Sequence, residues 1–461
     1  MSQDKRDLTT GPVRGRLWQL GGPMVLGIAA VMAVPLADSY FLGQLGTEPL
    51  AAISYTFPVV LTLTSLAIGI GAGTSSVISR AIGNGDDERA KRVSTDAMAL
   101  AILLVVILST IGYFTISPLF SLLGASGEVL EMIVAYMQIW YLTLPVLSIM
   151  MVANNLLRSN GDARTASTLM IGIALINAAL NPVFIFGWNF IPAGGIEGAA
   201  WASFVARMFA GVLGMWAVAY RDRLLTLSFP SVAEVWESWK DVGKVAVPAG
   251  IGNAVNPFGI TIVTAILAAY GDDVVAGFGV ATRIESFVCI PMLALSAAIG
   301  PVAGQNYGAG ECERVRQAHV LSYQFSAVWS LAMAVLLWFT GPWLATLFSD
   351  EQSVIDTITT YLQIVPITLA GYGIAVVVAG GLNSIGKPVY GLGVYLIRTA
   401  ALYVPLAWFA STMFEPWGVF AAIAVANVIG GVAIVWWSLK TLPGSADEIP
   451  EGARQTANQA V

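Results

Sequence analysis

The sequence is poor in charge and in the side chains that build metal sites and disulfides. Charged residues make up 11% of the 461 positions, and there are two cysteines and one histidine. A chain with so little charge cannot cover the surface of a soluble globule. Cys289 and Cys312 are too few and too far apart for a disulfide framework or a zinc site, and His319 stands alone. We therefore expect a membrane protein without a bound metal.

Motifs for nucleotide-driven chemistry are also missing. The glycine-rich run 69–73 lies inside an apolar stretch and lacks the Lys-Ser/Thr pair of a phosphate-binding loop, and neither Lys244 nor Lys387 completes such a loop. The chain also lacks the converging nucleophile, base or metal cluster that a membrane-embedded enzyme would need. We expect a non-enzyme without cofactors, driven by a gradient of protons or sodium ions. A receptor that transports nothing stays open at this point.

Apolar residues are abundant and occur in long runs. Hydrophobic residues make up 57% of the chain, and the mean hydropathy is +0.75. A bilayer core about 30 Å thick requires roughly 20 apolar residues per helix. The predicted fold class is an all-α polytopic membrane protein. Its twelve predicted spans are 16–42, 50–80, 93–116, 128–157, 164–187, 197–220, 239–270, 276–305, 316–340, 351–382, 388–411 and 417–440.

Positive charges alternate between the breaks that separate these spans. Arg14 and Arg16 precede the first span and Lys440 ends the last, whereas the breaks near 43–49, 117–127, 188–196, 271–275, 341–350 and 412–416 contain no Lys or Arg. Lys and Arg of short loops are retained on the cytoplasmic side. We therefore expect both termini to be cytoplasmic and the chain to span the plasma (inner) membrane.

The two halves of the chain repeat one another. Pro23 recurs as Pro248, and Gly46 recurs as Gly271 at the same spacing. An even number of spans per repeat places both halves in the membrane in the same sense. We expect two pseudo-symmetric six-helix lobes around a central cleft. The predicted parts are a cytoplasmic N-terminal tail (1–15), an N-lobe (16–220), a cytoplasmic linker (221–238), a C-lobe (239–440) and a cytoplasmic C-terminal tail (441–461).

Asp38 is the only charged residue between positions 17 and 45. A carboxylate at bilayer depth costs about 3 kcal/mol on insertion scales, so it faces a partner or water and often binds an ion. We predict that Asp38 is the ion-coupling residue. Asn177 and Asn181 are spaced i, i+4 and share one helix face, so they are the predicted supporting residues of the N-lobe site. The alternative for these polar residues is helix packing alone.

Two prolines lie on the same span as Asp38. Pro23 and Pro35 each remove a backbone hydrogen bond and can kink the helix. We expect them to act as a hinge that responds to the charge on Asp38. A static kink is the alternative.

The second lobe carries one acid at comparable depth. Glu285 is a predicted secondary site unless it forms a structural ion pair with Arg398, and Arg207 is the structural counterpart of Arg398 in the first lobe. Polarizable, aromatic and amide side chains suit a permissive cleft, although each could simply pack. The predicted lining residues are Tyr136, Gln138, Met32, Phe57, Tyr361 and Gln363.

The chain resembles the multidrug and toxic compound extrusion (MATE) family over nearly its whole length, closest to the DinF-like branch. The residues that carry the resemblance are the segment 35–38 that ends in Asp38, the turns at 83–86 and 157–162, and the fifth-span segment 177–187. The resemblance implies a V-shaped antiporter that exports amphipathic, often cationic compounds in exchange for protons or sodium by alternating access. It also implies that Asp38 and Asn177 belong to the first-lobe site.

The chain departs from the family pattern in both lobes. Asn181 occupies a position that is commonly Asp, and Asn253 and Asn256 occupy the region where the NorM-type branch has an acid. Around Tyr372 there is no acid either. These departures favour coupling through the first lobe.

One further transport function is an alternative. Related two-lobe folds flip lipid-linked saccharides, a function that predicts extra spans or a strongly cationic cleft. The expected partners are small organic substrates and membrane lipids, with no nucleic acid, and we expect a monomer.

Overall fold

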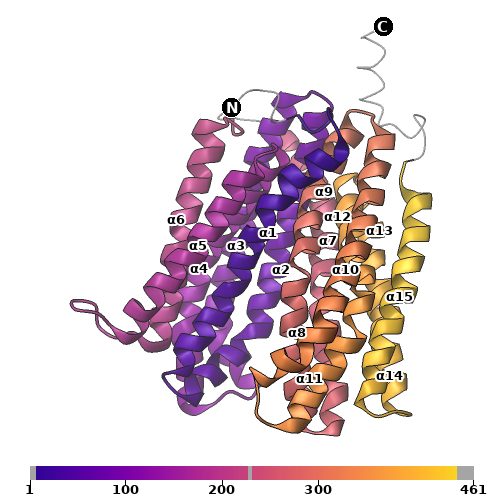
Figure 1. Ribbon diagram of the computed structural model, residues 1–461. Coiled ribbons are helices and arrows are strands. Elements are labelled where there is room, and N and C mark those ends of the chain that lie inside the picture. The colour runs from indigo at the N-terminus through magenta and orange to yellow at the C-terminus, as the bar shows by residue number, and fades with distance from the viewer. Residues whose placement is uncertain (1–6, 227–230, 444–461) are drawn as a thin grey trace. The chain divides into compact units, whose positions relative to one another are not determined.

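The chain is built from α-helices. The computed structural model describes residues 7–226 and 231–443, in which the only strand-like pairing is an isolated bridge between Trp188 and Ile191. The elements labelled in Figure 1, together with the short 3-10 and π segments η2 to η5, are α1 (Val13–Gly43), α2 (Thr47–Gly83), α3 (Asp87–Leu122), α4 (Gly127–Ser159), α5 (Ala163–Phe186), α6 (Gly195–Trp216), η2 (Ala217–Arg221), α7 (Val232–Leu267), η3 (Ala268–Tyr270), α8 (Asp272–Val288), α9 (Ile290–Gly308), α10 (Cys312–Thr346), α11 (Gln352–Ile364), η4 (Pro366–Thr368), α12 (Leu369–Ser384), α13 (Pro388–Tyr395), η5 (Leu396–Tyr403), α14 (Val404–Ser411) and α15 (Pro416–Thr441).

These helices confirm the predicted polytopic membrane fold. Within the described residues, 11 helical stretches are long and apolar enough to cross a membrane, and the pair α8 and α9 brings the number to 12. The predicted eighth span, 276–305, is broken at Cys289, where the pair bends by 45°. Pro291 follows the break and lacks the N–H that would continue the hydrogen-bond ladder of α8.

The chain divides into two compact units. In the described residues, unit 1 comprises 22–82 and 86–247, and unit 2 comprises 7–21, 83–85 and 248–443. The predicted lobes differ from this division at 16–21 and 83–85, which belong to unit 2, and at 239–247, which belong to unit 1. α1 and α7 therefore each pass from one unit into the other, next to the corresponding prolines Pro23 and Pro248.

The segment before α1 is anchored in unit 2. Leu8 has an exposed fraction of 0%, its N–H donates to Gln305 Oε1 at 3.0 Å, and Asn306 Nδ2 donates to its carbonyl at 3.1 Å. The guanidinium of Arg314 donates to the carbonyl of Gly11 at 2.9 Å. From residue 7 onward, the predicted N-terminal tail is therefore part of the packed structure, whereas 1–6 lie outside the described residues.

The first turns of α7 are anchored in unit 1. Trp239 Nε1 donates to the carbonyl of Asp96 at 2.8 Å, and Arg89 pairs with Asp241 at 3.3 Å. The predicted linker 221–238 is thus shorter than expected, because helix begins at Val232. Residues 227–230 of this linker and 444–461 of the predicted C-terminal tail lie outside the described residues.

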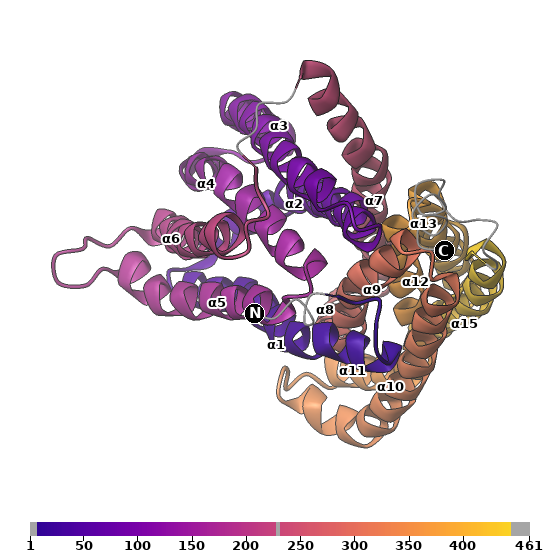
Figure 2. The same cartoon turned by 90° about the horizontal axis from the view of Figure 1, so that it is seen from above.

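Small residues let the helices of unit 1 approach closely. α5 and α6 lie side by side in Figure 1 and Figure 2, and a Cβ at Gly198 would lie 2.1 Å from the carbonyl oxygen of Phe184. Gly112 of α3 likewise faces the ring of Tyr141 on α4. Helix association in membranes depends on such close packing. It holds α5 and α6 together as the part of unit 1 that carries the asparagines predicted above.

Aromatic contacts hold the core of unit 2. The ring of Tyr361 on α11 lies 5.6 Å from Phe278 of α8 and 5.2 Å from Phe420 of α15, both in edge-on arrangements. Such pairs contribute about 0.5–1.5 kcal/mol beyond their buried area. They fix the direction in which the Tyr361 hydroxyl points.

The turn motifs at 83–86 and 159–162 are helix junctions. Asp86 caps α3 and Asp162 caps α5, each accepting a hydrogen bond from a backbone N–H three residues on, at 2.9 and 3.0 Å. Gly85 (φ 74°) and Gly161 (φ 79°) adopt the left-handed conformation that glycine tolerates best. These motifs therefore position the starts of α3 and α5.

Candidate functional site

Asp38 of α1 lies against two asparagines of α5. Asn181 Nδ2 donates to Asp38 Oδ1 at 2.7 Å and to Asn177 Oδ1 at 3.2 Å. Asn177 Nδ2 in turn donates to the hydroxyl of Ser203 on α6 at 3.0 Å. Both asparagines are fully buried. The structure therefore joins the predicted acid and its two predicted neighbours in one chain of hydrogen bonds that ends at Ser203.

The electrostatic setting of Asp38 leaves its charge without a direct counterion. Among the described residues, no cation forms an ion pair with Asp38 within 4.0 Å. The charge of Arg207 acts on the carboxylate from farther away, and Arg207 Nη1 is buried without a hydrogen-bond partner. Asn181 Oδ1 is also buried without a partner. A carboxylate held by a neutral amide can accept a proton or a small cation without breaking an ion pair.

Sequence reasoning did not identify Ser203, and it assigned Arg207 a structural part only. The two residues are spaced i, i+4 on α6, so they share one helix face. That spacing of polar residues in an apolar helix is the signal that could have revealed them.

The predicted hinge prolines both lie inside α1, which stays helical from Val13 to Gly43. Ser167 Oγ of α5 donates to the carbonyl of Pro23 at 2.5 Å, and a Cβ at Gly27 would lie 2.9 Å from that hydroxyl. α1 is thus held against α5 near Pro23. Pro35 is exposed and lies three residues before Asp38. A hinge motion at either proline stays a prediction.

Glu285 and Arg398 do not form the direct ion pair considered from the sequence. The hydroxyl of Tyr361 donates to Glu285 Oε2, and no ion pair of Glu285 occurs within 4.0 Å in the described residues. Arg398 donates instead to Oδ1 of Asn256 at 2.9 Å and of Asn427 at 2.7 Å. The charges of Glu285 and Arg398 interact only at longer range. The amides reach the guanidinium first because α7 and α15 place them beside η5.

The residues predicted to line a cleft differ in exposure. Phe57 is 62% exposed, whereas Met32, Tyr136 and Gln363 are half-buried. Tyr361 is only 1% exposed and belongs to the aromatic core of unit 2. It therefore does not line a cleft in this structure. For the other four, contact with substrate stays a prediction.

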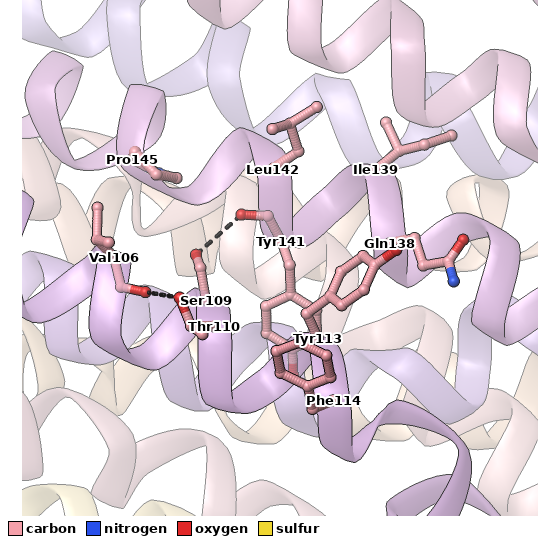
Figure 3. Close-up of a pocket in the computed structure, with 10 residues that line it drawn as sticks. All are labelled: Val106, Ser109, Thr110, Tyr113, Phe114, Gln138, Ile139, Tyr141, Leu142 and Pro145. Carbon is pink, nitrogen blue, oxygen red and sulfur yellow. Dashed lines mark hydrogen bonds between the residues drawn. The ribbon is translucent and has the colours of Figure 1, made fainter.

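Gln138 lines a cavity of about 500 Å³ between α3 and α4 (Figure 3). Pro145 lacks the N–H that would bond the carbonyl of Tyr141, and Ser109 Oγ donates to that carbonyl instead, at 2.9 Å. The cavity is lined by aromatic, aliphatic and uncharged polar residues. Gln138 therefore lies at a cavity that residues of α3 also line, which its position in the repeat did not indicate.

Comparisons with known proteins agree with this architecture. The family model described as MatE matches residues 23–183 and 248–409, two segments that begin at the corresponding prolines. A Shewanella oneidensis protein described as an FAD transporter is 36% identical over 94% of this chain and 95% of its own length. A Bacillus subtilis protein described as the probable multidrug resistance protein YpnP is 26% identical, over 89% and 90%. The solved MATE transporter VcmN of Vibrio cholerae in the bent form aligns with a TM-score of 0.87 and 28% identity, over 96% of this chain and 98% of that one. The chain therefore belongs to the multidrug and toxic compound extrusion (MATE) family of membrane transporters.

Proposed function

We propose that this transporter exports an organic solute in exchange for protons that bind to Asp38. The observation that carries the proposal is the 2.7 Å hydrogen bond from Asn181 to Asp38 inside the membrane-spanning part of unit 1. An acid at this depth is costly and marks an ion path by default. A single carboxylate held by amides favours a proton, and sodium is the alternative because amide and carboxylate oxygens also suit it.

The proposed coupling step begins with Asp38 ionised and bonded to Asn181. When a proton arrives from outside, the hydrogen bond loses its charge assistance, which weakens it by roughly 1 kcal/mol. Pro35 has already removed one backbone hydrogen bond from α1, so bending there costs less than in an uninterrupted helix. We propose that α1 then bends and displaces substrate from unit 1. A solved structure of the Vibrio cholerae relative is described as being in the bent form, which supports the existence of a bent state in this family.

Two substrate classes have support from relatives. A flavin dinucleotide is the first candidate, because the relative described as an FAD transporter is 36% identical over almost the whole chain. Amphipathic organic cations are the second, because the relative described as a probable multidrug resistance protein covers 89% of the chain. The saccharide-lipid flippase has no comparable support.

The decisive experiment uses the purified chain in proteoliposomes whose interior is more acidic than the medium. Uptake of FAD and of the cationic dye ethidium is measured in parallel, with and without this outward-directed proton gradient, and again with an outward-directed sodium gradient. Gradient-driven uptake of FAD supports the first candidate, and uptake of ethidium alone supports the second. Uptake driven by sodium but not by protons would disprove the proton part of the proposal.

We also propose that the transporter lies in the inner membrane as a monomer, with both termini cytoplasmic and without a cofactor. The alternation of Lys and Arg between spans supports the orientation. A cysteine introduced at Thr10, in a chain without Cys289 and Cys312, should react with a membrane-impermeant thiol reagent only from the cytoplasmic side. Light scattering of the detergent-solubilised protein tests the monomer.

A further inference from the structure

Unit 2 contains a buried positive charge whose nearest partners are uncharged. Arg398 lies in η5 and is 3% exposed. Its Nη1 donates to Asn256 Oδ1 at 2.9 Å and its Nη2 donates to Asn427 Oδ1 at 2.7 Å. Among the described residues, no carboxylate lies within 4.0 Å of this guanidinium. Burying an unpaired charge is expensive, so the surroundings must replace a counterion.

The surroundings of Arg398 are those of a cation site. Two aromatic faces flank the guanidinium, with its Cζ 4.8 Å from the ring centroid of Tyr372 and 5.7 Å from that of Tyr403. Aromatic faces attract cations, and the two amide oxygens are hard ligands of the kind that small cations prefer. Asn427 is itself oriented, because its Nδ2 donates to Thr368 Oγ1 at 3.3 Å.

The backbone is shaped around the same residue. Arg398 lies in a π-helical segment, a rare conformation that is frequent at functional sites. A Cβ at Gly371 would lie 1.9 Å from the backbone oxygen of Asn427, so glycine is required for α12 to approach α15 at the level of the ligand. Close packing therefore holds one of the two amide ligands in place.

Glu285 is the acid whose charge Arg398 can balance. The charges of the two residues act on one another, although Glu285 Oε2 takes its hydrogen bond from Tyr361. An arginine guanidinium stays protonated at any physiological pH and is tethered to the chain. The charge that balances Glu285 can therefore neither leave nor follow a gradient. In unit 1, by contrast, Asp38 has only neutral hydrogen-bond partners.

We propose that Arg398 is the built-in, non-exchangeable cation that balances Glu285 in unit 2, so that only the Asp38 site exchanges ions with the solution. Arg398 is thus a specificity-determining residue for the coupling ion. The inference rests on the proposed function in one respect, since it leaves Asp38 as the sole exchanging site.

Removing the guanidinium tests this role. Arg398→Ala leaves Glu285 without its cation and opens a space beside the two amides, so transport should fall at least tenfold in medium with choline as the only added cation. Millimolar guanidinium, far below denaturing concentrations, or sodium should restore transport and raise the apparent melting temperature of the purified variant. The wild type should respond to neither cation. Arg398→Lys keeps a tethered charge and should need no added cation.

Two controls make the outcome specific. Arg283→Ala removes an exposed arginine of the same unit and should stay insensitive to added cations. Glu285→Gln combined with Arg398→Ala removes the acid as well and should abolish the response to guanidinium. If Arg398→Ala does not fold, Arg398→Gln replaces it, because glutamine keeps most of the side-chain volume. Its transport and its melting temperature are then measured with and without added sodium.

The proposal is overturned if Arg398→Ala and Arg398→Gln transport like wild type in choline medium. It is equally overturned if neither sodium nor guanidinium changes their transport or melting. Failure of the proposed function would look different: Asp38→Asn would keep pH-driven transport, while the melting of Arg398→Ala would still depend on added cation.

Discussion

Replacing Asp38 with asparagine removes the exchangeable charge of unit 1 and leaves the local structure intact. Asparagine has nearly the same shape, and its Oδ1 can accept the same hydrogen bond that Asn181 donates to Asp38 at 2.7 Å. The bond becomes a neutral one, worth about 1 kcal/mol instead of the roughly 1.5–3 kcal/mol of a charge-assisted bond. We therefore expect Asp38→Asn to fold and insert normally while losing its coupling to the gradient.

The size of the lost effect can be calculated for the exchange of one proton per substrate molecule, as expected for a single exchanging carboxylate. A gradient of about two pH units stores about 2.7 kcal/mol, which corresponds to a roughly 100-fold limiting ratio of substrate across the membrane. With the membrane potential clamped to zero, the wild type should approach that ratio, provided that leak is slow. Asp38→Asn should equilibrate substrate without accumulating it.

The assay is uptake into proteoliposomes with an acidic interior, followed to its plateau. Exchange of labelled for unlabelled substrate without a gradient reports whether the variant still binds and moves substrate. Glu48→Gln, at an exposed acid in the first turn of α2, is the matched control and should accumulate substrate like wild type. A plateau for Asp38→Asn equal to that of the wild type would refute the coupling role of Asp38.

Three further predictions concern stability, measured as thermal unfolding in detergent. Ser109→Ala should destabilise the protein by about 1 kcal/mol, because it removes the donor to a carbonyl that a proline of α4 leaves free. Burial raises the pKa of the Asp162 carboxyl, but hydrogen bonds at the start of α5 and the charge of Arg221, 2.5 Å away, hold that pKa below its ordinary value of 3.8. The charge on Asp162 thus adds stability above about pH 4 that is lost as the pH falls, so the advantage of wild type over Asp162→Asn should be full at pH 7 and shrink in acid. Gly371→Ala should lower stability by about 1–3 kcal/mol, because its methyl group would meet the backbone oxygen of Asn427.

Each of these changes has a matched partner in the chain. Thr110→Ala removes a hydroxyl bonded only to its own helix, so its melting temperature should stay near that of wild type. Asp86→Asn alters the equivalent cap of α3, where the described residues include no ion pair, so it should cost less stability at pH 7 than Asp162→Asn. Gly243→Ala adds a methyl group with no atom within 4 Å and should be neutral or slightly stabilising. A variant no less stable than its matched partner would contradict the corresponding argument.

The spans and the first-lobe site were predictable because each rests on short-range or membrane-imposed rules. The thickness of the hydrocarbon core sets the length of an apolar run. The hydropathy of this one sequence, without an alignment, therefore located the helix ends to within a few residues in most cases. The i, i+4 spacing of Asn177 and Asn181 placed both amides on one face of α5. Because Asp38 lies deep in the membrane, its carboxylate required a polar neighbour, and these two amides were candidates within the same six-helix repeat.

The partners of Arg398 were not predictable in the same way. Sequence reasoning paired Arg398 with Glu285 because opposite charges at similar depth attract. Which partner a guanidinium reaches depends on the directions of side chains from several helices, and in this fold Asn256 and Asn427 reach it first. The π-helical turn that carries Arg398 changes those side-chain directions further, and the pattern of apolar residues in the sequence does not predict this turn.

The sequence by itself determined that this is a membrane-embedded, two-fold repeated helical transporter with one exceptional acid in its first span. The membrane helices and the exceptional acid follow from composition, from run length and from the cost of burying charge, which act on each helix separately, whereas the repeat follows from the matching residues of the two halves and the transport function from the family resemblance. Only the tertiary structure decided that α1 and α7 each begin in one unit and continue in the other, and that the buried arginine of unit 2 is held by amides and aromatic faces. Such arrangements depend on which helices pack together, because a side chain's partners are set by its neighbours in space and not by its neighbours in the chain.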